Sequence, residues 1–372
     1  MGEEGVGEDD APVTPSDDQP LAVVVERPRS DIAIESLRAE DVYDADRRVR
    51  PYTDETVALP VTGPPNETDV LEVIRQVDPD YRSRDLEDLL RERGWDEAAL
   101  EGAPGSWAVI GSVILVGVPV DCPDETAVAE ALLELHGEAD TVLADEGIAD
   151  VTVGEGGVHR EPRRRHLAGS RDTETVHVED GTQYALDPTT VMFSPGNQAE
   201  RRRMGAIVSA DERVFDMFAG IGYFTLPMAR AGARVTATEV NPTAFRYLLE
   251  NAMANDVASR VEAYHTDCRE IASRLAVDRV VMGYYGVGDS SAEGTRHHEA
   301  VDFLPAALEA LEPGGVLHYH EATHESDLWE RPLERLGEGV ESAGRTLEVL
   351  EKRRVKSHSA GVAHVVVDAR ID

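Results

Sequence analysis

The chain has 372 residues, of which 73 are acidic and 36 basic, so its formal net charge is −37, and this length accommodates two or three domains. Its two cysteines, Cys122 and Cys268, lie far apart without a Cys-x-x-Cys pattern or clustered histidines, which excludes a disulfide framework and a zinc site. The first residues do not resemble a signal peptide and no apolar run approaches the roughly 18 residues of a membrane span, so we expect a soluble, cytoplasmic protein with no membrane partner.

The basic residues are almost all arginine, because only Lys352 and Lys356 are lysine. A large acidic excess strains a compact fold in dilute buffer, but at molar salt the screening length is only about 3 Å and the repulsion is damped. The composition therefore indicates a salt-adapted protein, as in a halophilic archaeon. Net charge reports solubility, so it does not decide whether nucleic acid is a partner.

The amino-terminal part begins with residues 1–18, which are acidic and aperiodic and are expected to form a disordered tail. Residues 19–65 are predicted to be a small α/β module and residues 66–104 a helical connector. The expected elements are strands at Leu21–Val25 and Thr56–Val61, a helix at Asp31–Leu37, and amphipathic helices at Asp69–Val77 and Arg84–Arg93.

Residues 105–204 are predicted to form an α+β middle domain, and the basic run Arg163-Arg164-Arg165 within it indicates that this domain binds RNA. Turn residues Glu179-Asp180-Gly181 predict a hairpin between its last two strands. The expected elements are a strand pair in Trp107–Val118, a helix at Glu125–His136, and strands at Thr141–Leu143, Thr175–Val178 and Gln183–Leu186.

Residues 205–372 alternate strands with helices, which predicts a mostly parallel, Rossmann-like α/β sheet with helices on both faces. A final antiparallel hairpin, 347–355 with 362–370, closes the sheet edge. We predict the other strands at 213–217, 234–239, 260–264, 277–283 and 314–319, and helices at 224–231, 242–254, 268–275, 298–311 and 327–343. Ligands bind such sheets at the carboxyl ends of the strands, which brings together Phe218–Gly222, Glu239, Asp267 and Met282–Gly286.

A cofactor motif lies at the first of these strand ends. Asp216 precedes a Gly220-Ile221-Gly222 turn, and Glu239 ends the next strand, where it can accept hydrogen bonds from ribose hydroxyls. Thr225 stands where dinucleotide folds have a third glycine, so the turn is unsuited to pyrophosphate. The pattern resembles class I S-adenosylmethionine (AdoMet) enzymes, in which the position of Asp267 contacts the adenine. The alternative is an ordinary strand-to-helix turn.

Basic residues gather in three clusters: His159–Arg171, Arg201–Arg203 and Lys352–Lys356. In a chain this acidic, such clusters favour contacts with nucleic-acid phosphates. The alternative for each is a solvated surface of salt bridges.

Four longer motifs carry a family resemblance: His177-x-Glu-x-Gly-x-x-Tyr-x-x-Asp187, Phe193-Ser-Pro-Gly-Asn-Gln-Ala-Glu-Arg201, Asp216-Met-Phe-Ala-Gly-Ile-Gly-Tyr-Phe224, and Val355-Lys-Ser-x-Ser-x-Gly-Val-x-His-Val-Val-Val-Asp368. They resemble the archaeal-eukaryal tRNA guanine-37 methyltransferases and their sister group, the wybutosine-synthesising tRNA 3-amino-3-carboxypropyltransferases. The resemblance covers residues 107–372, and it extends by analogy to residues 19–65 as a tRNA-contacting domain. It implies a class I methyltransferase fold.

Two departures separate the sister groups. The chain has Ser194-Pro195-Gly196-Asn197 where the methyltransferases carry Ser-Pro-Arg-Leu, and Met282-Gly283-Tyr284-Tyr285 where they carry Asn-Leu-Pro. Both departures favour the aminocarboxypropyltransferase branch. Methyl transfer to the guanine is the alternative within the family. Outside it, the alternatives are an AdoMet enzyme for a small molecule and a non-catalytic RNA-binding scaffold.

The resemblance implies transfer of the aminocarboxypropyl group of AdoMet to carbon 7 of 4-demethylwyosine at position 37 of tRNA(Phe), by a monomer without a metal. It assigns no catalytic residue, and it makes Met282, Gly283 and Tyr284 the substrate pocket. Arg201 is expected to bind the carboxylate of the methionine arm bidentately. His265, His318 and His320 are expected to be packing or polar edge residues. Cofactor-binding residues are expected at Ser194, Asn197, Glu200, Arg201, Asp216, Phe218, Gly220, Gly222, Glu239, Asp267 and Cys268, and RNA-binding residues at Arg163, Arg164, Arg165 and Lys356.

Overall fold

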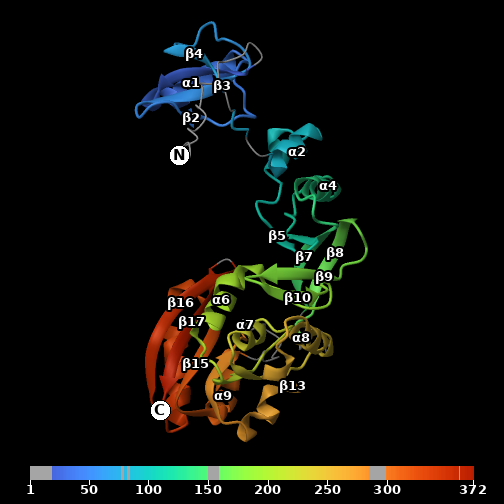
Figure 1. Cartoon of the computed structure of the whole chain (residues 1–372), viewed down its shortest axis with the longest axis vertical. Helices are drawn as coiled ribbons and strands as arrows, with labels where there is room; N and C mark the ends of the chain where they lie inside the picture. The colour runs from blue at the N-terminus through green and yellow to red at the C-terminus, as the bar shows by residue number, and fades with distance from the viewer. Residues whose placement is uncertain (1–18, 77–78, 82–83, 150–158, 285–298, 360) are drawn as a thin grey trace, which may run out of the picture. The chain divides into compact units, whose positions relative to one another are not determined.

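The computed structural model describes residues 19–76, 79–81, 84–149, 159–284, 299–359 and 361–372 (Figure 1). The tail predicted at residues 1–18, and Tyr285 and Gly286 of the predicted crevice, lie outside these ranges. The chain divides into two units, the first ending at Glu92 and the second beginning at Arg93. The small module predicted to end at residue 65 therefore extends further.

The first unit is an antiparallel sheet of order β2-β3-β1-β4. Valines and leucines of β1 and β3 pack against Ala33 and Leu37 of the first helix, as their apolar patterns predict. The elements are β1 (Leu21–Glu26), α1 (Ser30–Ala39), β2 (Arg50–Pro51), β3 (Thr56–Val61), β4 (Glu72–Arg75) and α2 (Leu86–Glu92).

The helix predicted at Asp69–Val77 is wrong, because Glu72–Arg75 form the edge strand β4. These residues pair with Val24–Leu21 of β1, about fifty positions earlier in the chain. Backbone bonds to a distant strand override the local helical pattern.

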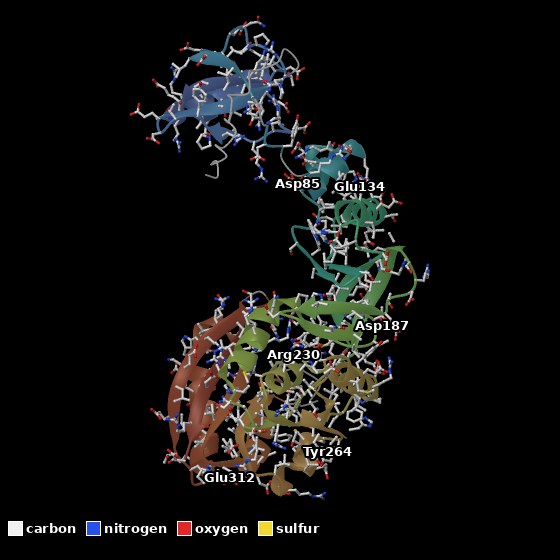
Figure 2. All side chains as sticks on the ribbon, in the orientation of Figure 1. Asp85, Glu134, Asp187, Arg230, Tyr264 and Glu312 are labelled. Carbon is white, nitrogen blue, oxygen red and sulfur yellow. The ribbon has the colours of Figure 1, made fainter. Side chains whose placement is uncertain are left out.

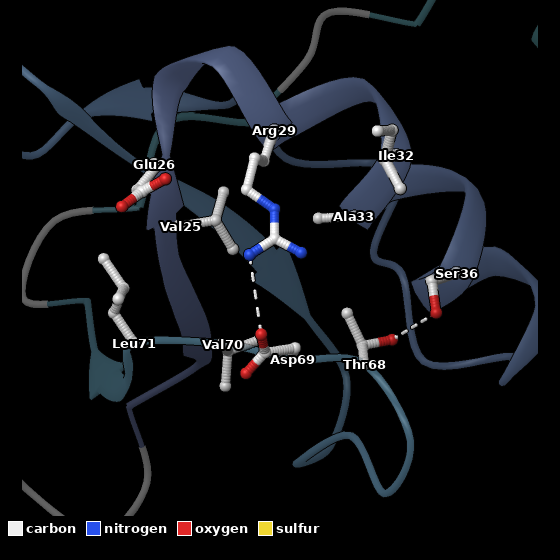
Figure 3. A pocket seen from close by; sticks show the side chains of 10 residues that line it. All are labelled: Val25, Glu26, Arg29, Ile32, Ala33, Ser36, Thr68, Asp69, Val70 and Leu71. Atoms are coloured by element: carbon white, nitrogen blue, oxygen red, sulfur yellow. Dashed lines mark hydrogen bonds and ion pairs between the residues drawn. The ribbon is translucent and has the colours of Figure 1, made fainter.

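A small hollow of about 120 Å³ lies between α1 and residues 68–71 of this unit (Figure 3). Arg29 reaches Asp69 across it at 3.5 Å, and Thr68 bonds Ser36 at 2.8 Å. Ligand pockets are typically about 300–1,000 Å³, so this hollow is small for a nucleoside cofactor.

The second unit begins with α3 and a four-stranded sheet of order β5-β6-β7-β8. The strands β6 and β7 are parallel and are joined through α4, whose N-cap Asp124 accepts hydrogen bonds from Thr126 and Ala127. The predicted strands and helix of this region are confirmed, whereas β8, which lies within the first basic cluster, was not predicted. The elements are α3 (Glu97–Leu100), β5 (Trp107–Ile110), β6 (Val113–Val116), α4 (Glu125–Leu135), β7 (Thr141–Ile148) and β8 (Pro162–Gly169).

A hairpin of β9 (Thr175–Glu179) and β10 (Thr182–Leu186) follows. Both turn residues, Asp180 and Gly181, have positive φ of 48° and 73°, as two-residue hairpins require. The predicted hairpin is therefore confirmed, and Figure 1 shows it beside α7 and α8.

The carboxyl-terminal sheet has seven strands in the order β13-β12-β11-β14-β15-β17-β16. The first five are parallel and the last two antiparallel, as predicted. Its strands are β11 (Arg213–Asp216), β12 (Arg234–Glu239), β13 (Val261–His265), β14 (Val277–Met282), β15 (Leu311–His324), β16 (Leu347–Ser359) and β17 (Val362–Ile371). The helices are α6 (Gln198–Ile207), α7 (Thr225–Arg230), α8 (Pro242–Ala254), α9 (Leu304–Ala310) and α10 (Glu330–Ser342).

Two apolar cores flank this sheet, because alternate residues of each central strand face opposite sides. Val214 and Val281 pack with residues of α7 and α8, whereas Phe215 and Val280 pack with residues of α9 and α10. The helix predicted at 268–275 is wrong: Cys268–Glu270 and Ala272–Arg274 form two short 3-10 turns. In the part of the chain that the structure describes, no helix combines the length and apolar character that crossing a membrane requires.

Candidate AdoMet and RNA site

The turn after β11 depends on its two glycines. Gly220 and Gly222 have φ of +57° and +106°, which a residue with a side chain rarely adopts. A Cβ on Gly220 would lie 2.5 Å from the Tyr223 ring, and one on Gly222 would lie 2.7 Å from Leu226 Cγ. The turn is therefore shaped by its own neighbours as well as by the backbone angles.

The amides of this turn are directed into the protein. Gly220 donates to Glu239 Oε2 at 2.8 Å, and Gly222 and Tyr223 donate to the Ala219 carbonyl at 2.8 and 3.2 Å. Ala219 itself donates to Thr238 at 3.0 Å. Phosphate sites need several amides directed at the ligand, and these amides are already bonded, so the site suits a nucleoside without phosphate.

Glu239 ends β12 half-buried against this turn. Its second carboxyl oxygen, Oε1, accepts a hydrogen bond from the backbone amide of Asn241 at 2.8 Å. Burial raises the pKa of the Glu239 carboxyl. A carboxylate oxygen can accept more than one hydrogen bond, so both oxygens keep capacity for ribose hydroxyls.

Asp216 is fully buried at the end of β11. Its Oδ2 accepts from Thr225 Oγ1 at 2.7 Å, whereas Oδ1 accepts no well-aligned hydrogen bond among the described residues. Burial raises the pKa of this carboxyl to about 6, against the lowering effect of Thr225. Asp216 thus joins β11 to the start of α7 and braces the turn.

Asp267, predicted beside the adenine, is bonded to Arg269. Its Oδ2 accepts from Arg269 Nη2 at 2.6 Å, and this hydrogen bond lowers the pKa of the carboxyl. The Arg269 guanidinium lies 4.9 Å from the centre of the Phe303 ring. Cys268 is buried, and burial raises the pKa of its thiol to about 12.

Three aromatic rings meet at the carboxyl ends of β11 and β14. Tyr284 lies 5.1 Å from Phe218 and 5.4 Å from Phe303, measured between ring centres, and Arg160 lies 5.4 Å from the Tyr284 centre. Met282 is buried beneath them. A Cβ on Gly283 would lie 3.0 Å from the Phe224 ring. The rings are inclined to one another, with interplanar angles of 35° between Phe218 and Tyr284 and 87° between Phe218 and Phe303. We call this cluster beside the 219–223 turn the aromatic wall.

The bidentate edge of Arg201 is bonded to a carboxylate of the protein, whereas the sequence predicts that it binds the carboxylate of the methionine arm. Arg201 is buried, and its Nε and Nη2 donate to Glu179 at 2.6 and 2.7 Å. Its Nη1 donates to the Ser194 carbonyl at 2.9 Å. Glu179 also bonds His177 at 3.0 Å. The guanidinium therefore ties the β9–β10 hairpin to the segment before α6.

Glu200 likewise has a protein partner. Its buried carboxylate is paired with Arg353 of β16, which also donates to Asp368 at 2.7 Å. His318 donates from Nδ1 to Asp368 at 2.6 Å and accepts from Arg279 through Nε2. His318 and His320 are both buried, as expected for packing residues.

Ser194 and Gly196 lie against Lys356. The Lys356 ammonium donates to Ser194 Oγ, and a Cβ on Gly196 would lie 3.2 Å from Lys356 Cδ. Asn197, which ends the 3-10 turn Pro195–Asn197, is buried. The Lys356 side chain thus lies over Ser194–Asn197. This is the segment whose sequence is expected to differ between the methyltransferases and the aminocarboxypropyltransferases.

The predicted RNA-binding arginines of β8 differ in their surroundings. The Arg164 side chain is 7% exposed and donates to Asp145 and to the Gly147 carbonyl at 2.7 and 2.8 Å. Arg165 is 48% exposed and pairs with Glu125 and Glu146. Arg163 is exposed and donates to the Glu146 carbonyl. Acidic and basic side chains are interspersed over the surface of this unit (Figure 2).

Within the described ranges, no group of three or more His, Cys, Asp or Glu side chains could hold a metal ion.

Comparison with known proteins identifies the family. Residues 175–350 match the TRM5/TYW2 methyltransferase domain, and residues 86–173 match the TYW2 N-terminal domain. The chain is 37% identical over 270 residues to the tRNA(Phe) (4-demethylwyosine(37)-C(7)) aminocarboxypropyltransferase of Pyrococcus horikoshii, and the match covers 72% of this chain and 90% of that protein. The chain belongs to the TRM5/TYW2 family.

Solved structures of this family share the fold. The P. horikoshii TYW2 in complex with MeSAdo superposes with a TM-score of 0.61 at 33% identity, covering 76% of this chain and 96% of that one. The M. jannaschii TYW2 in complex with AdoMet superposes with a TM-score of 0.53 at 34% identity, covering 72% of this chain and 99% of that one. The predicted class I methyltransferase fold is confirmed.

Sequence reasoning missed several residues of this TRM5/TYW2 site. Arg160 and Phe303 complete the aromatic wall, and Arg353 holds Glu200. Phe303 follows no motif. Arg160 and Arg353 belong to basic clusters in which nothing distinguishes them from their neighbours.

Proposed function

We propose that this protein transfers the 3-amino-3-carboxypropyl group of AdoMet to carbon 7 of 4-demethylwyosine at position 37 of tRNA(Phe). The observation that carries the proposal is the 37% identity to a relative of that name over most of both chains, together with the match to the TYW2 N-terminal domain. Transfer of the methyl group to guanine 37 is the second candidate, because the catalytic domain match is common to TRM5 and TYW2.

The bonds of the Ala219, Gly220, Gly222 and Tyr223 amides favour a ligand without phosphate, such as AdoMet, over a dinucleotide. Bound there, AdoMet would supply a sulfonium-activated methylene. As carbon 7 of the base bonds to it, the carbon–sulfur bond breaks, methylthioadenosine leaves and carbon 7 loses its proton. We infer that Glu239 accepts the ribose hydroxyls, that Phe218, Gly220 and Gly222 shape the turn, and that Asp216 braces it from below. Asp267 and Cys268 would border the adenine, with Arg269 holding the Asp267 carboxylate.

The aromatic wall is the proposed substrate pocket. Tyr284 and Phe218 offer flat surfaces on which an extruded purine can stack, and Met282 and Gly283 floor the space beside them. Such a wall orients a planar base while excluding water.

Gly196 and Lys356 support the aminocarboxypropyl branch. The methyltransferases are expected to carry arginine at the position of Gly196, and here the Lys356 stem occupies the adjacent space, 3.2 Å from where a Cβ on Gly196 would lie. We infer that Ser194, Asn197 and Lys356 face the amino-acid arm, and that Glu200 and Arg201 act by holding this segment in place.

We propose RNA contacts at Arg163, Arg165 and Lys356, so that the tRNA lies across β8 and β16. Arg164 is the least accessible of the three arginines of β8. We also infer a monomer working at high salt in the cytoplasm of a halophilic archaeon. The support is the charge of −37 and the charged side chains Glu348, Lys352 and Arg354 along edge strand β16.

The test is a pair of labelling reactions at molar salt, with carboxyl-labelled and methyl-labelled AdoMet and tRNA that carries the 4-demethylwyosine precursor. Only the carboxyl label is expected to enter the tRNA. Entry of the methyl label would instead show methyl transfer, and entry of neither label would contradict both candidates.

A further inference from the structure

Two asparagines of α8, Asn251 and Asn255, bond the free edge of β10. Asn255 Oδ1 accepts a hydrogen bond from the backbone amide of Gln183 at 2.9 Å, and Asn255 Nδ2 donates to the backbone carbonyl of Gln183 at 2.7 Å. Asn251 forms the same two bonds with Ala185, at 2.7 and 3.1 Å. The two side chains, one helical turn apart, replace the neighbouring strand that β10 lacks on this side.

The remaining hydrogen of each side-chain amide distinguishes the two residues. Asn255 donates it to the Asn251 carbonyl of its own helix at 2.8 Å. Asn251 donates it to the Ile221 carbonyl at 3.0 Å, and Asn251 is fully buried. Ile221 lies between Gly220 and Gly222, so Asn251 alone of the pair joins the hairpin to the proposed cofactor turn.

Two bonds from outside this turn add to the internal bonds that hold its shape. Glycine populates many backbone conformations. With a glycine on each side of Ile221, the local sequence gives this backbone little preference for one conformation. The Gly220 amide is held by Glu239, and the Ile221 carbonyl that follows it is held by Asn251. The bond from Gly220 to Glu239 and the bond from Asn251 to Ile221 therefore hold the turn at two successive residues.

We propose that Asn251 is a positioning residue for AdoMet: it orients the Gly220-Ile221-Gly222 backbone and couples that turn to the β9–β10 hairpin. The inference rests on the proposed function only in taking AdoMet as the ligand of the turn. Since coupling between two sites is reciprocal, AdoMet binding should also steady the hairpin edge at Ala185.

The experiment compares Asn251→Ala with the matched control Asn255→Ala at molar salt. Calorimetric titration measures the AdoMet dissociation constant, and thermal unfolding measures stability. Both variants lose two bonds to β10, so both should unfold at lower temperature. Only Asn251→Ala should also weaken AdoMet binding, by about tenfold, roughly one hydrogen bond's contribution, while Asn255→Ala stays within about twofold.

Hydrogen exchange of the unaltered protein gives a second measurement that does not depend on the variants folding. AdoMet should slow exchange of the Ala185 amide more than that of the Gln183 amide. Equal weakening of AdoMet binding in both variants, or equal protection of the two amides, would overturn the inference. Failure of the unaltered protein to bind AdoMet at all would instead overturn the proposed function.

Discussion

Arg201 and Glu179 form a buried bidentate ion pair, with Nε–Oε2 and Nη2–Oε1 distances of 2.6 and 2.7 Å. The third bond of Arg201, to the Ser194 carbonyl, extends this pair to the segment before α6. Two sequence motifs of the family therefore meet at one guanidinium. That guanidinium links the β9–β10 hairpin to the segment before α6.

Removing this guanidinium should be strongly destabilising, because the Glu179 carboxylate would remain buried without its partner. We expect Arg201→Ala to lower the free energy of unfolding by about 3–5 kcal/mol, measured by denaturant unfolding at molar salt. The adjacent Arg202→Ala is the control, since its pair with Asp180 is exposed to solvent and should contribute little to stability. Equal losses in the two variants would contradict the positioning role.

The cofactor turn should not tolerate a side chain at Gly222. Gly222→Ala combines a φ of +106° with a Cβ 2.7 Å from Leu226. The control Gly344→Ala has a φ of +69° with nothing within 4 Å of the Cβ, so it should cost only about 1–2 kcal/mol. We expect Gly222→Ala to cost more and to weaken AdoMet binding by at least about tenfold. Unchanged AdoMet affinity would place the ligand elsewhere.

Asp216 should make stability depend on pH. Its folded-state pKa of about 6 lies above the ordinary value of 3.8, so the folded state holds the proton more tightly than the unfolded state. Stability from this group is present below about pH 4 and is lost as pH rises to about 6. The pKa shift of Asp216 corresponds to a change of about 3 kcal/mol in the free energy of unfolding.

This dependence is measured as the difference in unfolding free energy between the unaltered protein and Asp216→Asn across pH 4–7. The variant lacks the titrating group, so it should gain relative stability as pH rises through this window. A difference that stays constant with pH would show that the carboxyl is not desolvated.

Gly196→Arg should interfere with the proposed aminocarboxypropyl transfer, because the new side chain must displace Lys356 from Ser194. We expect a fall of about tenfold or more in carboxyl-label transfer to tRNA. Gly137→Arg adds the same charge where nothing lies within 4 Å of the Cβ. If both variants keep full transfer activity, Lys356 and Gly196 have no part in the reaction.

The arginines of β8 should separate into two functions. Arg165→Ala should weaken tRNA binding and reduce the slope of log affinity against log salt by about 1, because Arg165 is exposed. Arg164→Ala should instead lower stability by about 1–3 kcal/mol, since its side chain is nearly buried against Asp145. Binding across a salt series and thermal unfolding measure the two effects, and a reversed assignment would contradict the structure.

Local patterns predicted most of the carboxyl-terminal sheet. The alternation of strands and helices, the Asp180-Gly181 hairpin and the glycines at 220 and 222 each depend on residues within a few positions of one another. Such short-range preferences can be read along the chain without knowing what lies nearby in space. For the same reason the glycine turn and the strand ending at Glu239 could be predicted before any fold was known.

Pairings across long separations could not be read in that way. The strand at Glu72–Arg75 forms because β1 offers it an edge, and Arg353 finds Glu200 at a separation of 153 residues. With 73 carboxylates available to 36 basic residues, composition cannot select the partner of any one arginine. The sequence alone therefore does not predict Glu179 as the partner of Arg201, because distance and burial, rather than residue type, determine which charges meet.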